Sequence, residues 1–369
     1  MASKDGQKSQ PRVLFLCGGS PEYPSNRIKI EILDRHTRLT KLISRRKNHI
    51  TRLLEVMIRF PFYLRNVDVF FVGWIGQPLV VLIRLFSKKP IIFDLQTELF
   101  EAICIDRKYY SAKSVVGRIA WFLDEYAHKH SDVIIVHDRI NAKRVQTLFH
   151  VPPKKIVLIP MCADRSIFYP REQVKSIQYK NKFLVEFCGE MSPSHGVEYI
   201  IQAAKLLEDT NIFFRISGKG QCLPKAKELY ENILPINVEF VGRYLNRDEF
   251  IEQKASADLS LVMFGDTPKS RHVLMNKHFE TIAMGRPILT GGPPEIYGVT
   301  EFFKDGENAF FVSVANPVLL AEKIKWIRDH DSIRQRVSEH GRDFFEKVCS
   351  QENMDRRVRE AVEIVYASW

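Results

Sequence analysis

The stretch LMNKHFETIAMGRPILTGGPPE, from Leu274 to Glu295, carries the pattern that decides the fold. A polar loop ends in an Asn-Lys pair, and the apolar spacing that follows predicts a short helix. A small-residue turn leads into a Pro-led apolar strand, which stops at a Gly-Gly-Pro-Pro break. A helix that runs directly into a short, continuously apolar strand is the repeating unit of a doubly wound α/β sheet.

The same alternation of apolar strands and amphipathic helices extends outward along the chain. Continuous apolar runs predict strands at Val13–Gly19, Val67–Trp74, Pro90–Gln96, Ser131–Asp138, Lys155–Pro160, Phe183–Gly189, Ile212–Gly220, Val238–Gly242, Ala257–Phe264 and Arg286–Gly291. Apolar residues three and four apart predict helices between them, for example at Val115–His130 and Gly196–Glu208. Fully apolar strands separated by helices are typical of parallel sheets covered on both faces.

Chain length and a charged break predict two domains. The 369 residues exceed what one hydrophobic core usually spans. Residues 164–182 are rich in charge and show little periodicity, which is typical of a linker. We therefore expect a first domain over residues 1–170, a second over residues 171–349, and a C-terminal helix at about 350–369 that packs back on the first.

Composition indicates a globular protein with an anionic partner. Hydrophobic residues make up 45% of the chain, and the most apolar window, Val67–Phe86, is interrupted by polar residues. Without a membrane span or a signal-peptide pattern, we expect a cytoplasmic protein, soluble or peripheral on the membrane face. The net charge of +11 favours nucleic acid, anionic lipid, or nucleotide and phosphate ligands. The chain lacks the motifs of nucleic-acid binders, so we expect no nucleic acid.

The six cysteines predict neither a metal site nor a redox pair. No two of them form a CxxC motif, and most lie in apolar runs where they would act as small core residues. This usage fits a reducing cytoplasm. No cluster of His, Cys, Asp or Glu has metal-ligand spacing, so we expect no metal.

Glycine-rich turns follow several predicted strands, at the sheet edge where α/β proteins bind ligands. Gly18 and Gly19 follow the first strand, and Gly218 and Lys219 lie in the SGKG turn that ends another. Backbone N–H groups in such turns suit phosphate or sugar oxygens. The alternative for each turn is an ordinary tight connection, so neither identifies a site by itself.

FGDTPKSRHVLMNKHFE, from Phe264 to Glu280, is the strongest candidate site. Lys269 and Lys277 are point charges suited to a diphosphate. Asn276 is placed to cap the following helix, whose N-terminus favours anions. Glu280 lies one turn further and is suited to accept hydrogen bonds from two ribose hydroxyls. The alternative is an exposed salt bridge between Lys277 and Glu280, which would contribute little.

The chain resembles the retaining family-4 glycosyltransferases, which have the GT-B fold. FCGEMSPSHGVEYIIQA is similar to their Gly-ended strand and following turn, SGKG to their Gly-x-Gly turn, and NKHFETIAMGRPILTG to their Asn-Lys-x-x-Glu segment. KDGENAFFVSVANPVLLAEKI resembles the loop after that strand. SDVIIVHDRINAKRVQTLFHVPPKKIVLIPMCADRSIFYP is similar to the end of the family's N-terminal domain.

The resemblance implies two facing, doubly wound Rossmann-like domains with an interdomain cleft. The first domain would bind the acceptor and the second a nucleotide-sugar donor, UDP- or GDP-linked. The implied activity is retaining transfer to a glycan or lipid-linked acceptor, of the bacterial surface-polysaccharide, lipopolysaccharide or glycolipid type, without a cofactor or metal. A GT-B-like sugar-nucleotide epimerase or an inactive scaffold is the alternative.

The resemblance also implies roles for single residues. Glu280 would hold the donor ribose, and Lys269 and Lys277 would act in catalysis by neutralising the donor diphosphate. The remaining donor-site residues would be Gly18, Gly19, His195, Gly196, Gly218, Lys219, Gly265 and Asn276.

The chain departs from the family pattern at two places. Many members carry a further glutamate eight positions before the ribose-binding one, where this chain has His272. Many members also place an Arg and a Lys after the first strand of the donor domain, where this chain has Glu190 and His195. We infer that Lys269 and Lys277 take over the diphosphate.

Carboxylates in FDLQTELFE, from Phe93 to Glu101, are candidates for the acceptor side. Asp94, Glu98 or Glu101 could position the acceptor hydroxyl, and we name Glu98 as the catalytic candidate. Glu98 and Glu101 equally fit a solvated helix start.

A basic arm, Arg35–Arg65, carries nine Lys or Arg residues and a single acid, Glu55. Leu39, Leu42, Ile43 and later apolar residues recur at helical spacing. The pattern predicts a basic amphipathic helix whose apolar stripe packs on the sheet and whose cations attract it to an anionic membrane surface. The alternative is a helix that packs on the sheet with its cations solvated.

Overall fold

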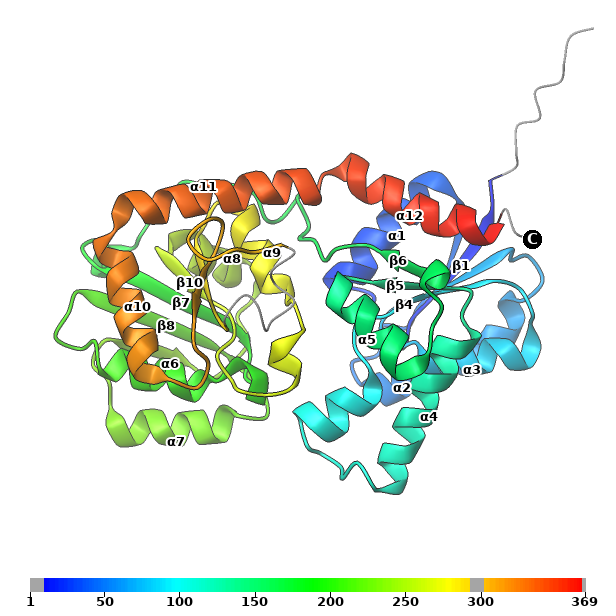
Figure 1. The fold of residues 1–369 in the computed structure, drawn as a ribbon, viewed down its shortest axis with the longest axis horizontal. Coiled ribbons are helices and arrows are strands. Elements are labelled where there is room, and N and C mark those ends of the chain that lie inside the picture. The colour runs from blue at the N-terminus through cyan, green and yellow to red at the C-terminus, as the bar shows by residue number, and fades with distance from the viewer. Residues whose placement is uncertain (1–9, 293–301, 367–369) are drawn as a thin grey trace, which may run out of the picture. The chain divides into compact units, whose positions relative to one another are not determined.

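Figure 1 shows the computed structural model, which describes residues 10–292 and 302–366. The chain divides into two compact units. Unit 1 comprises Met1–Ala102, Tyr110–Pro160 and Gln351–Trp369, and unit 2 comprises Ile103–Tyr109 and Met161–Ser350. Unit 2 therefore begins earlier than residue 171, and it includes a short segment from the N-terminal half of the chain.

The core of unit 1 is a parallel sheet in the order β2-β1-β3-β4-β5-β6. Its strands are β1 (Arg12–Leu16), β2 (Arg38–Leu42), β3 (Val69–Val72), β4 (Ile91–Asp94), β5 (Val133–Val136) and β6 (Ile156–Leu158). Every residue of β3, β4 and β5 is buried. The continuous apolar runs of these strands follow from this burial on both faces.

Helices cover both faces of this sheet. They are α1 (Pro24–His36), α2 (His49–Arg59), η1 (Phe60–Tyr63), α3 (Gln77–Phe86), α4 (Val115–His130), α5 (Arg139–Phe149), η3 (Pro153–Lys155) and α12 (Gln351–Tyr366), and a π-helical turn, η2 (Glu101–Asp106), follows β4. α1 and α12 lie on one face, and α2 to α5 lie on the other (Figure 1). The helix predicted at Val115–His130 is confirmed with the same bounds. α12 contacts α1 and the strands β3 to β6.

The basic arm Arg35–Arg65 is not the single amphipathic helix that its spacing predicted. It forms strand β2, an irregular segment, α2 and η1. β2 lies at the sheet edge beside β1 and exposes most of its residues, so its sequence is neither continuously apolar nor strictly alternating. α2 begins only at His49, because the Asn48 side chain accepts hydrogen bonds from the N–H groups of Ile50 and Thr51.

Unit 2 contains a second parallel sheet, in the order β12-β11-β10-β7-β8-β9. Its strands are β7 (Phe183–Glu190), β8 (Ile212–Lys219), β9 (Val238–Val241), β10 (Leu259–Leu261), β11 (Ile288–Gly291) and β12 (Phe310–Val312). The predicted α/β class, with a parallel sheet in each half, is confirmed. The chain moves from β7 outward to β9 and then returns to β10 on the other side of β7, so the winding direction reverses between β7 and β10.

The helices of unit 2 also form two layers. They are η4 (Ile177–Tyr179), η5 (Pro193–His195), α6 (Val197–Lys205), α7 (Leu223–Ile233), α8 (Arg247–Ser256), η6 (Lys269–Arg271), α9 (Asn276–Ala283), α10 (Pro317–Asp329) and α11 (Asp331–Val348). α10 packs on α6, and α11 packs on α9 (Figure 1). The Pro-Pro-Glu end of the opening stretch, 293–295, lies outside the described residues.

Two of the six cysteines form a disulfide, which corrects the expectation that they act only as small core residues. Cys162 and Cys349 are bonded, with Cα atoms 5.6 Å apart, and both lie in unit 2. Cys17 and Cys188 are buried, as expected. None of the helices in the described residues is long and apolar enough to cross a membrane.

Candidate active site

The candidate site lies at the carboxyl edge of the unit 2 sheet, where the winding direction reverses. The loop after β7 and the loop after β10 are joined there by backbone hydrogen bonds. The Phe264 N–H donates to the His195 carbonyl at 3.1 Å, and the Gly265 N–H donates to the Ser194 carbonyl at 3.1 Å. Ligands of doubly wound sheets bind at this type of switch point.

Glycine is required where these two loops touch. Gly196 has a φ of 61°, and a Cβ built on it would lie 2.5 Å from the Gly265 nitrogen. A Cβ on Gly265 would lie 2.0 Å from the Pro193 carbonyl oxygen. Gly218 packs against the backbone of Gly189 in the neighbouring strand. The structure therefore brings the predicted Gly196, Gly218 and Gly265 to one sheet edge.

Lys277, on α9, is the most unusual cation of this edge. It is only 9% exposed, and its Nζ has no hydrogen-bond partner among the residues that the structure describes. The Nζ lies 4.1 Å from the centre of the Phe187 ring, and a Cβ on Gly189 would lie 2.8 Å from it. Burial, and then the nearby Lys254, lower the pKa of Lys277 to about 8. A buried ammonium without an acceptor is costly, so the position favours binding of an anion.

Glu280 lies one turn further along α9 and is 8% exposed. Because both Glu280 and Lys277 are buried, the exposed salt bridge considered as the alternative does not describe them. A buried ion pair also contacts α9. Lys254 lies 3.2 Å from Glu186, and its Nζ donates to the Thr281 hydroxyl at 3.1 Å. The buried Lys254 therefore links Glu186, on β7, to Thr281, on α9, and its charge is paired.

Asn276 does not cap α9, which corrects the sequence-based interpretation. The helix begins at Asn276, and Met275 occupies the N-cap position. The Met275 N–H donates instead to Nδ1 of His278 at 3.1 Å. The Asn276 Oδ1 is buried and has no hydrogen-bond partner within residues 10–292 and 302–366. A buried acceptor of this kind is suited to a hydrogen bond from a ligand.

Lys269 is paired with a carboxylate that sequence reasoning missed. Its Nζ lies 3.3 Å from Oδ2 of Asp106, and the Thr267 hydroxyl lies 3.5 Å from Oδ1. The Asp106 side chain is fully buried. Asp106 belongs to the segment Ile103–Tyr109 and is 163 positions from Lys269, so no local pattern links the two residues.

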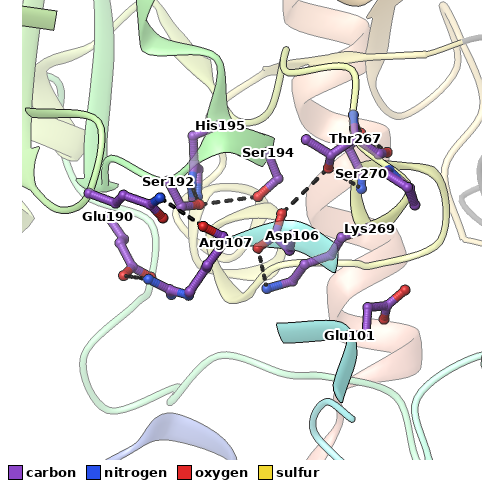
Figure 2. A network of polar contacts seen from close by, with 12 residues as sticks. Glu101, Asp106, Arg107, Glu190, Ser192, Ser194, His195, Thr267, Lys269 and Ser270 are labelled. Atoms are coloured by element: carbon purple, nitrogen blue, oxygen red, sulfur yellow. Dashed lines mark hydrogen bonds and ion pairs between the residues drawn. The ribbon is translucent and has the colours of Figure 1, made fainter. Parts of the chain in front are cut away.

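The next residue of that segment, Arg107, was also missed. Its guanidinium makes two contacts with Glu190, at 2.7 Å and 2.8 Å (Figure 2). The Gln221 side chain donates to the Arg107 carbonyl at 2.8 Å. Glu190 stands where the resemblance noted in the sequence would have placed a cation. The sequence signal available was an adjacent Asp-Arg pair, which comes four residues after FDLQTELFE.

His195 is a neutral hydrogen-bonding group at the centre of these charges. Its Nδ1 lies 2.7 Å from the Ser192 hydroxyl, and the ring is buried. Burial lowers the pKa of His195 well below its usual value, and Lys277, Lys269 and Arg107 lower the pKa further. Three cations from three separate segments therefore disfavour a charged imidazole at this position.

Lys219 differs from the other predicted residues of unit 2 because its side chain is exposed. It ends β8, directly beside Glu190 in the paired strand. Within the described residues, no three His, Cys, Asp or Glu side chains converge as metal ligands.

The remaining predicted residues belong to unit 1. Gly18 and Gly19 let the loop after β1 pack tightly on the loop after β3, with the Gly19 N–H donating to the Trp74 carbonyl at 2.8 Å. Asp94 is buried and ion-paired with Lys29, whose Nζ lies 2.6 Å from both carboxylate oxygens. These contacts give all three residues a structural role within unit 1.

Glu98 lies in a segment that a buried carboxylate fixes in place. Asp124, on α4, accepts hydrogen bonds from the N–H groups of Leu99 at 2.9 Å and Phe100 at 2.8 Å. Burial raises the pKa of Asp124 to about 7. Glu98 itself is 6% exposed, so it is not part of a solvated helix start.

Comparison with known proteins identifies the domain in the second half of the chain. Residues 169–344 match the family model "Glycosyl transferases group 1". An MMP alpha-(1->4)-mannosyltransferase of Mycolicibacterium hassiacum is 22% identical over 275 residues, covering 72% of this chain and 60% of the relative. An uncharacterized glycosyltransferase of Methanocaldococcus jannaschii is 25% identical over 44% of this chain and 42% of its own length. The matches therefore span about half the length of these curated relatives.

Solved structures agree on the fold over almost the whole chain. Alr3699/HepE of Anabaena, solved with UDP and glucose, has a TM-score of 0.71 at 14% identity, covering 96% of this chain and 99% of that one. Sucrose-phosphate synthase of Thermosynechococcus elongatus has a TM-score of 0.76 at 12% identity, covering 98% of this chain and 100% of that one. The expected GT-B fold is confirmed, and it carries a group 1 glycosyl transferase domain.

Proposed function

We propose, from the group 1 glycosyl transferase domain at residues 169–344, that this chain is a glycosyltransferase. Unit 2 binds a UDP- or GDP-linked sugar, and unit 1 binds a glycan or lipid-linked acceptor. Transfer proceeds with retention at the anomeric carbon, as in the family-4 enzymes that the sequence resembles. The observation that carries the proposal is Lys277, a buried ammonium without a hydrogen-bond partner, one turn before a buried Glu280.

The geometry of α9 supports separate roles for its two ionised residues. Glu280 accepts hydrogen bonds from the ribose hydroxyls of the donor. Lys277 and Lys269 bind the diphosphate, and they stabilise the negative charge that grows on it as the sugar leaves. Preorganised cations are effective here because the site is buried and little reorganisation is required. His195 and the backbone of Gly196 and Gly265 line the same edge.

Glu98 remains our candidate for positioning the acceptor hydroxyl. Its burial, and the hydrogen bonds that fix Leu99 and Phe100 to Asp124, hold this carboxylate in a defined place in unit 1. Glu98→Gln should lower kcat while leaving the affinity for the nucleotide unchanged. Loss of nucleotide affinity in this variant would argue against a role on the acceptor side.

The first experiment is a thermal-shift screen with UDP, GDP, ADP and CMP and their sugar forms. A ligand that binds only the folded protein raises its melting temperature by mass action. We expect one nucleotide class to stabilise the protein, and Glu280→Ala to abolish this effect. Glu231→Ala, which removes an exposed helical carboxylate of unit 2, is the matched control and should respond like the wild type. Stabilisation by none of the nucleotides would refute the proposed function.

We also propose that unit 1 docks on an anionic membrane surface, at its cytoplasmic face, where a lipid-linked acceptor would lie. Ile50, Leu54, Ile58 and Phe62 recur every four residues along α2 and η1, and they are 70%, 52%, 72% and 86% exposed. Exposed cations at positions 45–47 precede this apolar stripe. An apolar stripe beside basic residues is typical of helices that lie in the membrane interface.

Two neighbouring helices on the same face of the sheet also carry exposed apolar residues. Leu85 and Phe86 at the end of α3, and Val115 and Ile119 at the start of α4, are exposed as well. α2, α3 and α4 lie side by side on this face (Figure 1).

Liposome sedimentation tests this docking. The wild type should bind vesicles that contain phosphatidylserine at low salt, and less at high salt, because salt screens the cations. Ile58→Asp should weaken binding, whereas Ile177→Asp, at an exposed isoleucine of unit 2, should not. Equal binding by both variants would place the membrane contact elsewhere, and absence of binding by the wild type would reject it.

A further inference from the structure

We propose that Arg107, carried into unit 2 by the segment Ile103–Tyr109, is a binding residue for the donor diphosphate. This inference rests on the proposed function, because it assigns a further ligand to the same donor site. It adds a residue from the N-terminal half of the chain to a site that is otherwise built from the second half. Four observations on the described residues support it.

The backbone of the segment is fixed to unit 2 on both sides of the Arg107 side chain. Asp106, the preceding residue, is fully buried and lies 3.3 Å from the Nζ of Lys269. The Gln221 side chain, at the end of the SGKG turn, donates to the Arg107 carbonyl at 2.8 Å. The backbone that carries Arg107 is therefore fixed by contacts with unit 2.

Glu190 orients the Arg107 guanidinium but leaves some of its N–H donors available. Glu190 accepts from two guanidinium nitrogens, at 2.7 Å and 2.8 Å. A guanidinium carries five N–H donors, so this contact engages only part of its capacity. The planar fork that binds a carboxylate also matches two phosphate oxygens.

The pair is open to a ligand, in contrast to the buried pair beneath α9. The side chains of Arg107 and Glu190 are 22% and 39% exposed, whereas those of Lys254 and Glu186 are 1% and 0% exposed. The Lys254 pair can therefore act only as structural support. Arg107 can be reached by an anion that arrives from solvent.

Arg107 and Lys277 flank consecutive residues of β7. The Lys277 ammonium lies against Gly189, and Arg107 is bound to the next residue, Glu190. Lys277 is nine-tenths buried and lacks a hydrogen-bond partner, so it identifies this strand end as a place for an anion. Both cations are also close enough to His195 to act on its ionisation.

Glu190 therefore has a defined role in the proposal. It holds the Arg107 fork at the strand end and balances its charge when no donor is bound. A diphosphate carries more negative charge than one carboxylate, so it competes well for the same N–H groups. Removing Glu190 should leave Arg107 cationic and relieve this competition.

The experiment compares the two partners of the pair. Affinities for UDP, UMP and uridine, and for the GDP series in parallel, are measured by titration calorimetry on the full chain. We expect Arg107→Gln to weaken UDP binding about ten- to hundredfold, as for the loss of a charge-assisted hydrogen bond, and to leave uridine binding unchanged. Arg107→Lys should fall in between. Glu190→Gln should bind UDP at least as well as the wild type.

A purely structural ion pair gives a different pattern. Loss of the pair would then affect Arg107→Gln and Glu190→Gln equally, and it would weaken uridine and UDP alike; either result overturns the proposal. Arg12→Gln is the matched control, because Arg12 makes a similar two-contact pair with Asp68 in unit 1.

The outcome separates this proposal from the proposed function. A wild type that binds neither UDP nor GDP contradicts the glycosyltransferase assignment itself. A wild type that binds UDP, together with an Arg107→Gln variant that binds it equally well, overturns only the role of Arg107. Melting temperatures of all variants show whether each is folded.

Discussion

The buried ammonium of Lys277 makes nucleotide binding sensitive to pH at the scale of a single residue. Its pKa is lowered to about 8, so the unliganded protein loses this cation as the pH rises through 8. We expect the affinity for UDP to fall above pH 8, by at most about tenfold per pH unit for one proton. Calorimetric titration between about pH 6.5 and 9.5 measures this slope.

Lys277→Met should bind UDP more weakly and lose this dependence. Lys227→Met, at an exposed lysine of α7, should keep the wild-type slope and is the control. A flat wild-type profile, or a slope that survives in Lys277→Met, would show that the ammonium does not bind the diphosphate.

The lowered pKa of Lys277 also makes the free energy of unfolding depend on pH. The folded pKa of Lys277, about 8, is below its ordinary value of 10.5. Between these values the unfolded chain binds more protons than the folded one, so the free energy of unfolding rises with pH in this window. Urea unfolding at pH 8 and pH 10 should show a larger increase for the wild type than for Lys277→Met; identical increases would contradict the shift.

Residues that share one helix were accessible to sequence reasoning, and residues paired over long distances were not. Lys277 and Glu280 were identified because three positions along a helix place both on one side. Asp106 and Arg107 pair with residues 163 and 83 positions away. Such pairs follow from the fold as a whole, so no local pattern predicts them.

The contact between the loops after β7 and β10 is a property of two elements, and Gly196 tests it. Ala at this position must adopt a φ of 61° and place its Cβ 2.5 Å from the Gly265 nitrogen. We expect Gly196→Ala to lose about 1–3 kcal/mol of stability and to weaken nucleotide binding, because the loop that carries His195 must move. Thermal unfolding and UDP titration measure both effects.

Gly285→Ala is the matched control for this prediction. Gly285 has a φ of 64°, but a Cβ there meets nothing within 4 Å. The free energy of unfolding of Gly285→Ala should fall by only about 1–2 kcal/mol, because alanine must adopt a left-handed backbone conformation. UDP binding should be unchanged. If the two variants behave alike, backbone strain alone explains Gly196 and the loop contact does not matter for binding.

Helices with a regular apolar spacing could be predicted from the sequence, whereas the strand at the sheet edge could not. The helix Val115–His130 keeps an apolar side along its length, and its bounds were found from the sequence. β2 exposes most of its residues at the sheet edge, so helical spacing in the basic arm was misleading. The start of α9 was missed by one residue, because Asn276 has the chemistry of a cap but not the position.

At the scale of the whole molecule, alternation of strands and helices was sufficient to predict two parallel sheets. The unit boundary was less accessible, because the segment Ile103–Tyr109 follows β4 in sequence but belongs to unit 2 by its contacts. The disulfide was not accessible either. It joins Cys162 to Cys349 across 187 positions, and spacing carries no information about such a pair.

This disulfide should stabilise unit 2 as a whole, because it joins residues that lie next to the two ends of Met161–Ser350. Closing a loop of this length lowers the entropy of the unfolded chain, which corresponds to about 5 kcal/mol in the chain-entropy limit. We expect a reductant, or Cys349→Ser, to lower the denaturant midpoint by a comparable amount. Cys162→Ser should show the same loss and no further response to reductant.

Thiol counting provides the independent check on this prediction. The six cysteines minus the bonded pair leave four alkylatable thiols in the protein denatured without reductant, and six after reduction. Six thiols before reduction would show that the pair is not bonded in the purified protein, and the stability difference should then vanish. Four thiols with an unchanged midpoint after reduction would mean that the unfolded chain remains compact enough for loop closure to cost little.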